Sequence, residues 1–138
     1  MNNKYSNLKL DLLKDEYQYT LFNRHIDIKA AIDNLQTSNL PVGIFISQDE
    51  FSMIAPTNIS PLQNVEKTEG HWSCFRIIGD MPFGSVQGLI STISNTLFEM
   101  NIGICVVSTF KSDWFFIRSK YIDNAILALQ NAGWKIEK

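Results

Sequence analysis

Histidine and cysteine are scarce in this chain of 138 residues, which has two of each. His25 and His71 lie far apart, and neither joins cysteines or carboxylates at the spacing of a metal-binding motif, so the sequence predicts no metal and no cofactor. Cys74 and Cys105 each lie in an apolar stretch typical of a strand. Cysteines in such stretches usually act as small buried hydrophobic residues, so we expect two free thiols rather than a disulfide or redox pair.

Motifs of the common catalytic sites are also missing. The chain contains neither the G-x-S-x-G turn of a nucleophilic serine nor the G-x-G-x-x-G loop of a dinucleotide site. The stretch "GSVQG" (84–88) lacks the Lys-Ser or Lys-Thr pair that completes a phosphate-binding P-loop. These absences favour a protein that is not an enzyme.

Charge and hydrophobic runs limit the partners. A net charge of −2 gives no electrostatic reason to expect nucleic acid or an anionic membrane surface as a partner. No run approaches the roughly 18 apolar residues of a membrane span, and the first ten residues contain no continuous apolar segment of a secretory signal. We therefore expect a cytoplasmic globular protein, with 45% hydrophobic and 19% charged residues.

The first half of the chain has a mixed pattern. Residues 5–24 alternate loosely around a polar link at 14–16, which predicts a hairpin. A helix is predicted from Asp27, because apolar residues follow at intervals of three and four until Pro41 ends it. The runs 42–47 and 51–55 are typical of strands. Prolines, asparagines and charges then make 56–71 resemble a linker, so we predict domains at 1–65 and 66–138.

The second half alternates strands with helices. Strands are predicted at 72–79, 103–107 and 114–118, and a short edge strand at 134–138. Apolar stripes predict one helix with Val86, Leu89, Ile90, Ile93, Leu97 and Met100 on a single face, and a second from Ile122 that ends at Gly133. The order βαββαβ is the ferredoxin-like pattern of the α+β class, with antiparallel strands and the helices on one face.

The two halves resemble each other. "VGIFIS" (42–47) aligns with "IGICVV" (102–107), and Glu50 then aligns with Asp113. This weak internal repeat predicts two related modules. The first half lacks the final helix and strand, so its module is either truncated or exchanges segments with the second.

Two features of the second half suggest a ligand site. A helix that starts after "DMPFGS" (80–85) offers unpaired N–H groups to a carboxylate, and Gly84 and Gly88 leave room for it, although Gly88 equally fits close helix–sheet packing. Asp113 either closes a turn or binds an ammonium or guanidinium group. A short hairpin need not reach the helix start of its own module, so contact with a neighbouring module or chain is the easier use of Asp113.

On these residues, the chain resembles ACT-domain proteins, specifically the small tandem-ACT group related to the CASTOR arginine sensors and to aspartokinase regulatory domains. The resemblance covers roughly residues 40–133. Its motifs are "SQDEFSMIAP" (47–56), Trp72, Gly79, Phe83, "GLI" (88–90), Leu97, "NIGI" (101–104), "STF" (108–110) and Asp113. Ser112 and Trp114 depart mildly from residues that are frequent in the group, and residues 1–39 match poorly.

The resemblance implies a non-catalytic regulatory protein that binds a free amino acid or similar effector where ACT modules meet. Carried over by position, the implied ligand-binding residues are Gly84, Gly88, Leu89, Ile90, Ser108, Thr109 and Asp113, with Glu50 and Ser52 as first-module counterparts. It also implies two ACT modules, a homodimer and a possible regulated protein partner. The alternative is an ACT-fold module that binds other proteins without any small ligand.

Overall fold

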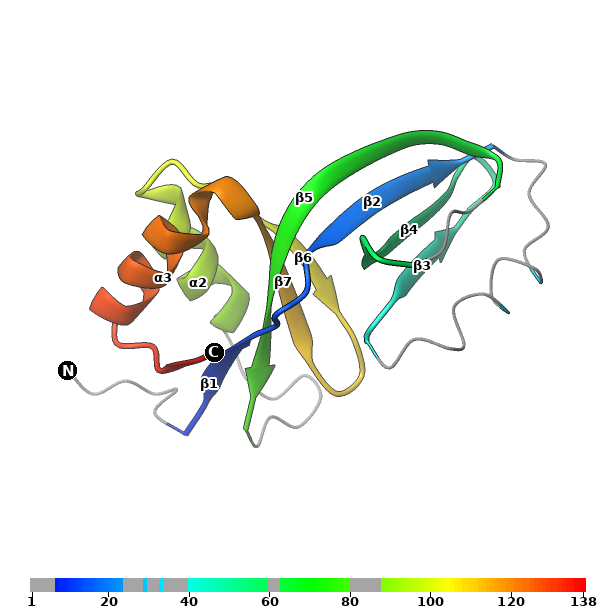
Figure 1. The fold of residues 1–138 in the computed structure, drawn as a ribbon. Helices are drawn as coiled ribbons and strands as arrows, with labels where there is room; N and C mark the ends of the chain where they lie inside the picture. Colours follow the sequence, from blue (N-terminus) through cyan, green and yellow to red (C-terminus); the bar gives the residue numbers. More distant parts are fainter. Residues whose placement is uncertain (1–6, 24–28, 30–32, 34–39, 60–62, 80–87) are drawn as a thin grey trace. The chain divides into compact units, whose positions relative to one another are not determined.

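The computed structural model describes residues 7–23, 29, 33, 40–59, 63–79 and 88–138 (Figure 1). The chain divides into two compact units: unit 1 takes Met1–Lys14 and Trp72–Lys138, and unit 2 takes Asp15–His71. This division differs from the predicted boundary between residues 65 and 66, because a segment near the N-terminus joins the second half of the chain.

Unit 1 contains the predicted βαββαβ order. Its elements are β1 (Lys9–Leu12), the part of β5 (Val65–Ile78) from Trp72 onward, α2 (Leu89–Phe98), β6 (Cys105–Ser108), β7 (Asp113–Arg118), the 3-10 turn η1 (Ser119–Tyr121), α3 (Ile122–Asn131) and β8 (Ile136–Glu137). The strands lie in the order β8-β1-β5-β7-β6. The predicted edge strand at the C-terminus is therefore confirmed, as β8.

The sheet of unit 1 is mixed, so the prediction of a purely antiparallel sheet was wrong. β5 pairs antiparallel with both β1 and β7, and β7 with β6, but β1 pairs parallel with β8. The parallel pair arises because β1 lies between β5 and β8. β1 runs opposite to β5, as β8 does, and two strands that both oppose β5 run parallel to each other.

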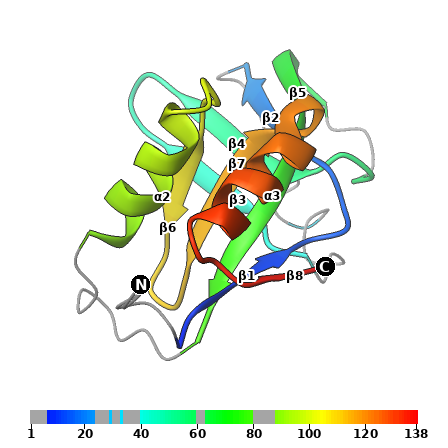
Figure 2. The ribbon, with the colours of Figure 1, turned by 90° about the vertical axis from the view of Figure 1, so that its left-hand side faces the viewer.

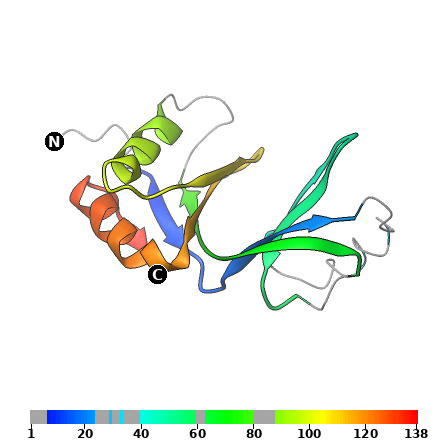
Figure 3. The same ribbon diagram turned by 90° about the horizontal axis from the view of Figure 1, so that it is seen from above.

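Both described helices of unit 1 cover one face of its sheet, as predicted (Figures 2 and 3). Alternate strand residues point to that face, where they pack against the apolar stripes of the helices. The buried core consists of Leu8, Leu10, Phe75, Ile77, Leu89, Ile93, Leu97, Ile102, Phe115, Ile117, Ala125, Ile126, Leu129 and Trp134.

The stripe of α2 is narrower than predicted. Leu89, Ile93 and Leu97 are buried, whereas Ile90 is 38% exposed and Met100, which lies beyond the helix, is 50% exposed. Val86 and the loop 80–85 lie outside the described residues. The helix therefore contacts the sheet through a row of residues four positions apart.

The helices of unit 1 end in the same way. After α3, Gly133 has a φ of 99°, its N–H donates to the Gln130 carbonyl at 3.0 Å and the Trp134 N–H donates to Leu129 at 3.0 Å. After α2, Asn101 has a φ of 58°, and the Ile102 N–H donates to the Leu97 carbonyl at 3.0 Å. This pattern is the Schellman motif, so the predicted stop at Gly133 is confirmed.

Unit 2 is a smaller sheet with its own apolar layer. Its strands are β2 (Tyr17–Phe22), β3 (Gly43–Ile46), β4 (Phe51–Pro56) and the beginning of β5, in the order β3-β4-β2-β5. Phe22, Phe51, Met53 and Ala55 form the buried cluster, in which the rings of Phe22 and Phe51 lie 5.1 Å apart.

Two predictions for the first half were wrong. The hairpin at 5–24 does not form, because β1 pairs in unit 1 and β2 pairs with β4 in unit 2. The linker at 56–71 contains the first half of β5, whose residues from Val65 to His71 are all exposed. Exposed edge strands often carry charged residues, so they lack the apolar–polar alternation by which a strand is recognised in a sequence. The predicted helix from Asp27 lies outside the described residues, except for Lys29 and Asp33, which are helical.

We predict that Gly79→Ala destabilises the protein by about 1–3 kcal/mol. Gly79 has a φ of +132°, and an added Cβ would lie 2.7 Å from the Asn7 carbonyl oxygen and 2.7 Å from Leu8 Cδ2. Gly103→Ala is the matched control, because an added Cβ there meets nothing within 4 Å. Urea unfolding of both variants measures the difference, and equal stabilities would contradict the prediction.

Candidate functional site

The start of α2 and the β6–β7 hairpin lie at the same end of the sheet in unit 1. α2 follows β5 in the chain, and β7 runs antiparallel to β5 with Trp114 opposite Arg76. The first residue of β7, Asp113, therefore lies near the end of β5 that leads toward α2. Figure 1 shows the β6–β7 hairpin at the same end of the sheet as the end of β5. This arrangement differs from the expectation that the hairpin would not reach the helix start of its own module.

Among the residues that the structure describes, no side chain caps the N-terminus of α2. Gly88 is the N-cap residue, with a φ of 75°, and no acidic residue lies in the first turn. The first N–H groups of a helix have no partner within the helix, so they are available to an anion. The Gly88 carbonyl accepts bonds from the N–H of Thr92 at 2.9 Å and from its hydroxyl at 2.7 Å.

The other predicted residues around this helix start differ in position. Leu89 is buried in the core, so only its backbone faces a ligand at the helix start. Ile90 is partly exposed, and Gly84 lies outside the described residues.

Asp113 is half-buried and lies on the helix-covered face of the sheet. It alternates with the core residues Phe115 and Ile117, and it stands opposite Ser108 of β6. Within the part of the chain that the structure describes, its carboxylate has no hydrogen bond or ion pair. A carboxylate in this state can accept a positively charged group.

The hairpin turn is closed by Thr109 rather than by Asp113. The Thr109 N–H donates to the Ser112 carbonyl at 2.8 Å, and its hydroxyl donates to the same carbonyl at 2.9 Å. The same hydroxyl accepts a bond from the Trp114 indole N–H at 3.2 Å. Of the two alternatives for Asp113, the structure thus contradicts the one in which its carboxylate closes the turn, and it gives Thr109 a structural role.

The proposed counterparts Glu50 and Ser52 lie in unit 2, where they bind each other. The Ser52 hydroxyl donates to Glu50 Oε2 at 2.6 Å. The strand registers also correct the repeat alignment by one residue. Ile46 stands opposite Phe51 as Ser108 stands opposite Asp113, so Phe51 is the residue of unit 2 that matches Asp113.

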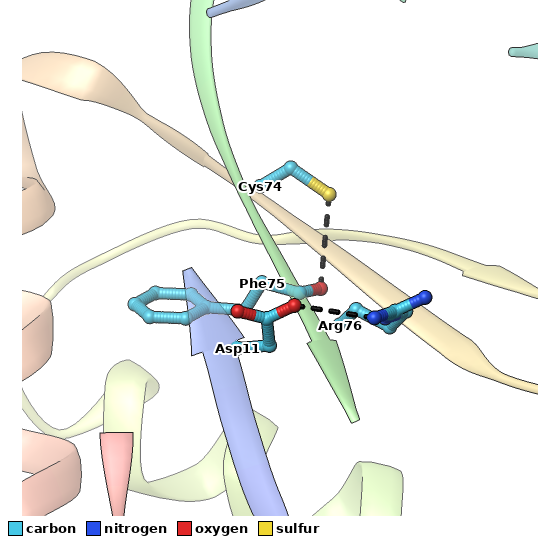
Figure 4. Close-up of polar contacts among 4 residues, drawn as sticks. All are labelled: Asp11, Cys74, Phe75 and Arg76. Carbon is cyan, nitrogen blue, oxygen red and sulfur yellow. Dashed lines mark hydrogen bonds and ion pairs between the residues drawn. The ribbon is translucent and has the colours of Figure 1, made fainter. Parts of the chain in front are cut away.

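Sequence reasoning did not single out Arg76, which lies on the face of the unit 1 sheet that the helices leave uncovered. Figure 4 shows its contact with Asp11. Its guanidinium lies 3.3 Å from Asp11 of β1 and 5.5 Å from the centre of the Trp114 ring. Its Nε is buried, with no partner among the described residues. The signal was a single charge inside the apolar run "WSCFRIIG", which predicts a cross-strand partner.

Cys74 lies next to Arg76 and is fully buried, and both cysteines are free, as predicted. Burial raises the pKa of the Cys74 thiol to about 12, an effect that Arg76 opposes and Asp11 reinforces. Because the thiolate is the reactive form of a cysteine, we expect the Cys74 thiol to react slowly in the folded protein.

Neither a metal site nor a membrane span is found in the described segments. No three His, Cys, Asp or Glu side chains gather there to hold a metal ion. No helix in those segments has the length and apolar character to cross a membrane.

A comparison with protein families identifies the domain. Residues 67–131 match the family model described as the ACT domain. This part of the chain is an ACT domain. The match covers β5 from Lys67 onward, β6, β7 and both described helices of unit 1, and so includes the start of α2 and the β6–β7 hairpin. No curated protein matches the chain.

Solved structures share the fold over nearly the whole chain. Protein Atu0741 from Agrobacterium tumefaciens has a TM-score of 0.78 at 28% identity, over 94% of this chain and 92% of that one. VC0802 from Vibrio cholerae, titled a possible transport protein, has a TM-score of 0.69 at 13% identity, over 91% and 90%. The regulatory subunit of aspartate kinase from Thermus thermophilus has a TM-score of 0.60 at 14% identity, over 91% and 96%.

We predict that Cys105 reacts with a thiol reagent in the native protein and that Cys74 reacts only after unfolding. Cys105 is half-buried, whereas Cys74 is fully buried. Mass spectrometry after brief labelling measures the number of modified thiols and their positions. Rapid modification of Cys74 in the folded state would contradict its assigned burial.

The raised pKa of Cys74 also predicts a loss of stability at alkaline pH. Above pH 9.0, the ordinary pKa of a thiol, the unfolded state releases the Cys74 proton, while the native state holds it to about pH 12. The native state then binds more protons, so stability falls with rising pH in this range, by at most about 1.4 kcal/mol per pH unit. Urea unfolding should show a shallower fall for Cys74→Ala, since other groups titrate equally in both proteins.

Thr109→Val should lower stability by about 1 kcal/mol, because the turn loses a hydroxyl donor and Trp114 loses its acceptor. Ser108→Ala on the neighbouring strand is the control, since no side-chain bond of Ser108 is lost among the described residues. Thermal unfolding of both variants tests this, and an unchanged Thr109→Val midpoint would refute the structural role of Thr109.

Proposed function

We propose that this protein is a non-catalytic regulatory protein that binds a free amino acid at the ACT domain of unit 1. The observation that carries the proposal is the Asp113 carboxylate, which has no partner among the described residues and lies at the same sheet end as the uncapped start of α2. An amino acid carries the two charges that such a pair of sites would complement.

The carboxylate of the ligand would bind the first N–H groups of α2. The partial positive charge of a helix N-terminus favours an anion, and Gly88 brings no side chain to the helix start. By contrast, α3 has Asp123 in its first turn and needs no external anion. The contacts to Leu89 and Ile90 would be made through this helix start, whereas Gly84 lies outside the described residues.

The positive group of the ligand would bind Asp113, with Ser108 on the opposite strand as a polar neighbour. A single carboxylate fits an α-ammonium group as well as a basic side chain. The likeness to aspartate kinase regulatory subunits leaves the side chain of the ligand open. We therefore propose the class of ligand rather than one amino acid.

Regulation would follow from a difference in affinity between conformations. A ligand shifts a conformational equilibrium only as far as it binds one state better than the other. We propose that the chain acts as two ACT modules in a cytoplasmic homodimer, and that a protein partner responds to the occupied state. The regulatory subunit of aspartate kinase among its structural neighbours supports a role of this kind.

A thermal-shift panel of the free amino acids tests this function. A ligand at about a hundred times its dissociation constant adds roughly 2.7 kcal/mol, which raises the melting temperature of a chain of this size by several degrees. We expect one amino acid, or one charge class, to give this shift. A flat panel on folded protein would refute the proposal and favour an ACT module that binds only proteins.

Asp113→Asn then tests the residue. It removes the charge but keeps the shape, so affinity should fall about tenfold or more while the melting temperature without ligand stays nearly the same. Asp123→Asn is the matched control, because Asp123 is a carboxylate of the same unit outside the site. Equal affinities in the two variants, measured by calorimetry, would remove Asp113 from the site.

A further inference from the structure

Asp113 lies beyond the point where β7 is held by the centre of the sheet. Trp114 is the last residue of β7 that pairs with β5, where it stands opposite Arg76. Asp113 pairs only with Ser108 of β6, and β6 pairs with no strand other than β7 in the described part of the chain. The backbone at Asp113 is therefore supported by an outer strand alone.

Side chains on the opposite face supply the support that the backbone lacks. Because neighbouring strand residues point to opposite faces, Trp114 lies on the face that the helices leave uncovered. Its indole N–H donates to the Thr109 hydroxyl at 3.2 Å, and that hydroxyl donates to the Ser112 carbonyl at 2.9 Å. Trp114 thus joins the last paired position of β7 to both ends of the hairpin turn.

The ring of Trp114 is fixed in turn from the centre of the sheet. The Arg76 guanidinium lies 5.5 Å from the ring centre, a distance at which a cation is attracted to the aromatic face. Arg76 is held by Asp11 of β1, whose Oδ2 lies 3.3 Å from Nη2 of the arginine, as Figure 4 shows. These side-chain contacts therefore run from β1 across β5 and β7 to the hairpin turn.

We propose that Trp114 is a positioning residue for the amino-acid site. Its contacts hold the β6–β7 hairpin so that Asp113, its neighbour on the helix-covered face, stays at the sheet end where α2 begins. Trp114 does not face a ligand on that side of the sheet, because its own side chain points to the other face. This role rests on the proposed function, and the effect of Trp114 on affinity would pass through Asp113.

A second tryptophan–arginine pair lies on the same two strands, at the end away from the hairpin. Trp72 of β5 stands opposite Arg118 of β7, and the guanidinium lies 4.2 Å from the ring centre. If such pairs only stabilise the sheet, substitutions of the two tryptophans should change stability alone. If Trp114 positions Asp113, its substitution should also change affinity, and that of Trp72 should not.

Trp114→Phe tests this role, with an equimolar mixture of the protein amino acids as the ligand probe. The phenyl ring can still lie beneath Arg76, but the hydrogen bond to Thr109 is lost. The concentration of the mixture needed for a given thermal shift should rise about fivefold, which corresponds to one lost hydrogen bond. Trp72→Phe is the matched control. It should lower the melting temperature without ligand, because a buried ring becomes smaller, but leave this concentration unchanged.

The Asp113→Asn background shows whether the effect passes through Asp113. There, Trp114→Phe should cause no further loss of affinity, whereas an independent structural effect would add to that of Asp113→Asn. An undiminished loss in this background, wild-type affinity in Trp114→Phe, or an equal loss in Trp72→Phe would each overturn the positioning role alone. A wild type that gives no shift with the mixture would refute the proposed function itself, and the positioning role with it.

Discussion

The pairing of β1 with β5 is the constraint on which unit 1 depends. This antiparallel contact brings a segment near the N-terminus into the second half of the chain and places it between β5 and β8. β8 must then pair with β1 in parallel, which makes the sheet mixed. The same strand supplies Leu10 to the core on one face and Asp11 to Arg76 on the other. Without β1, the apolar layer of the sheet would be incomplete and the Arg76 guanidinium would lose its counter-charge.

The two faces of this sheet perform different tasks because strand residues alternate between them. The helix-covered face carries the core and, at the start of β7, Asp113, where a charge replaces the row of apolar side chains. The face that the helices leave uncovered carries Arg76, Trp114 and the buried thiol of Cys74. Thr109 closes the hairpin turn, and its hydroxyl accepts a hydrogen bond from the indole N–H of Trp114. Among the described residues, the turn does not depend on the Asp113 carboxylate, which therefore has no structural role in it.

The two described hairpins have the same register but carry different residues at the matching position. In unit 1 the position that begins the second strand is Asp113, and in unit 2 it is Phe51, which packs on Phe22. Glu50 is one position earlier, where Ser52 binds its carboxylate. The polar character of this position is therefore confined to unit 1.

The sequence by itself determined the class of fold, the helices of unit 1 and the ACT character of the second half, because periodicities of two and of three to four residues and the stop at Gly133 are local signals. It also identified Asp113 and the start of α2. Only the tertiary structure decided which strands pair. β1 and β2 look like one hairpin but belong to different units, because strand partners are chosen by burial of apolar surface far away in the chain. Likewise, the strand at Val65–His71 could not be predicted because it carries charged residues and lacks apolar alternation, which an exposed edge strand does not need. The one-residue offset in the repeat alignment, by which Phe51 rather than Glu50 matches Asp113, could not be predicted from the sequence either. It depends on which residues close each hairpin turn.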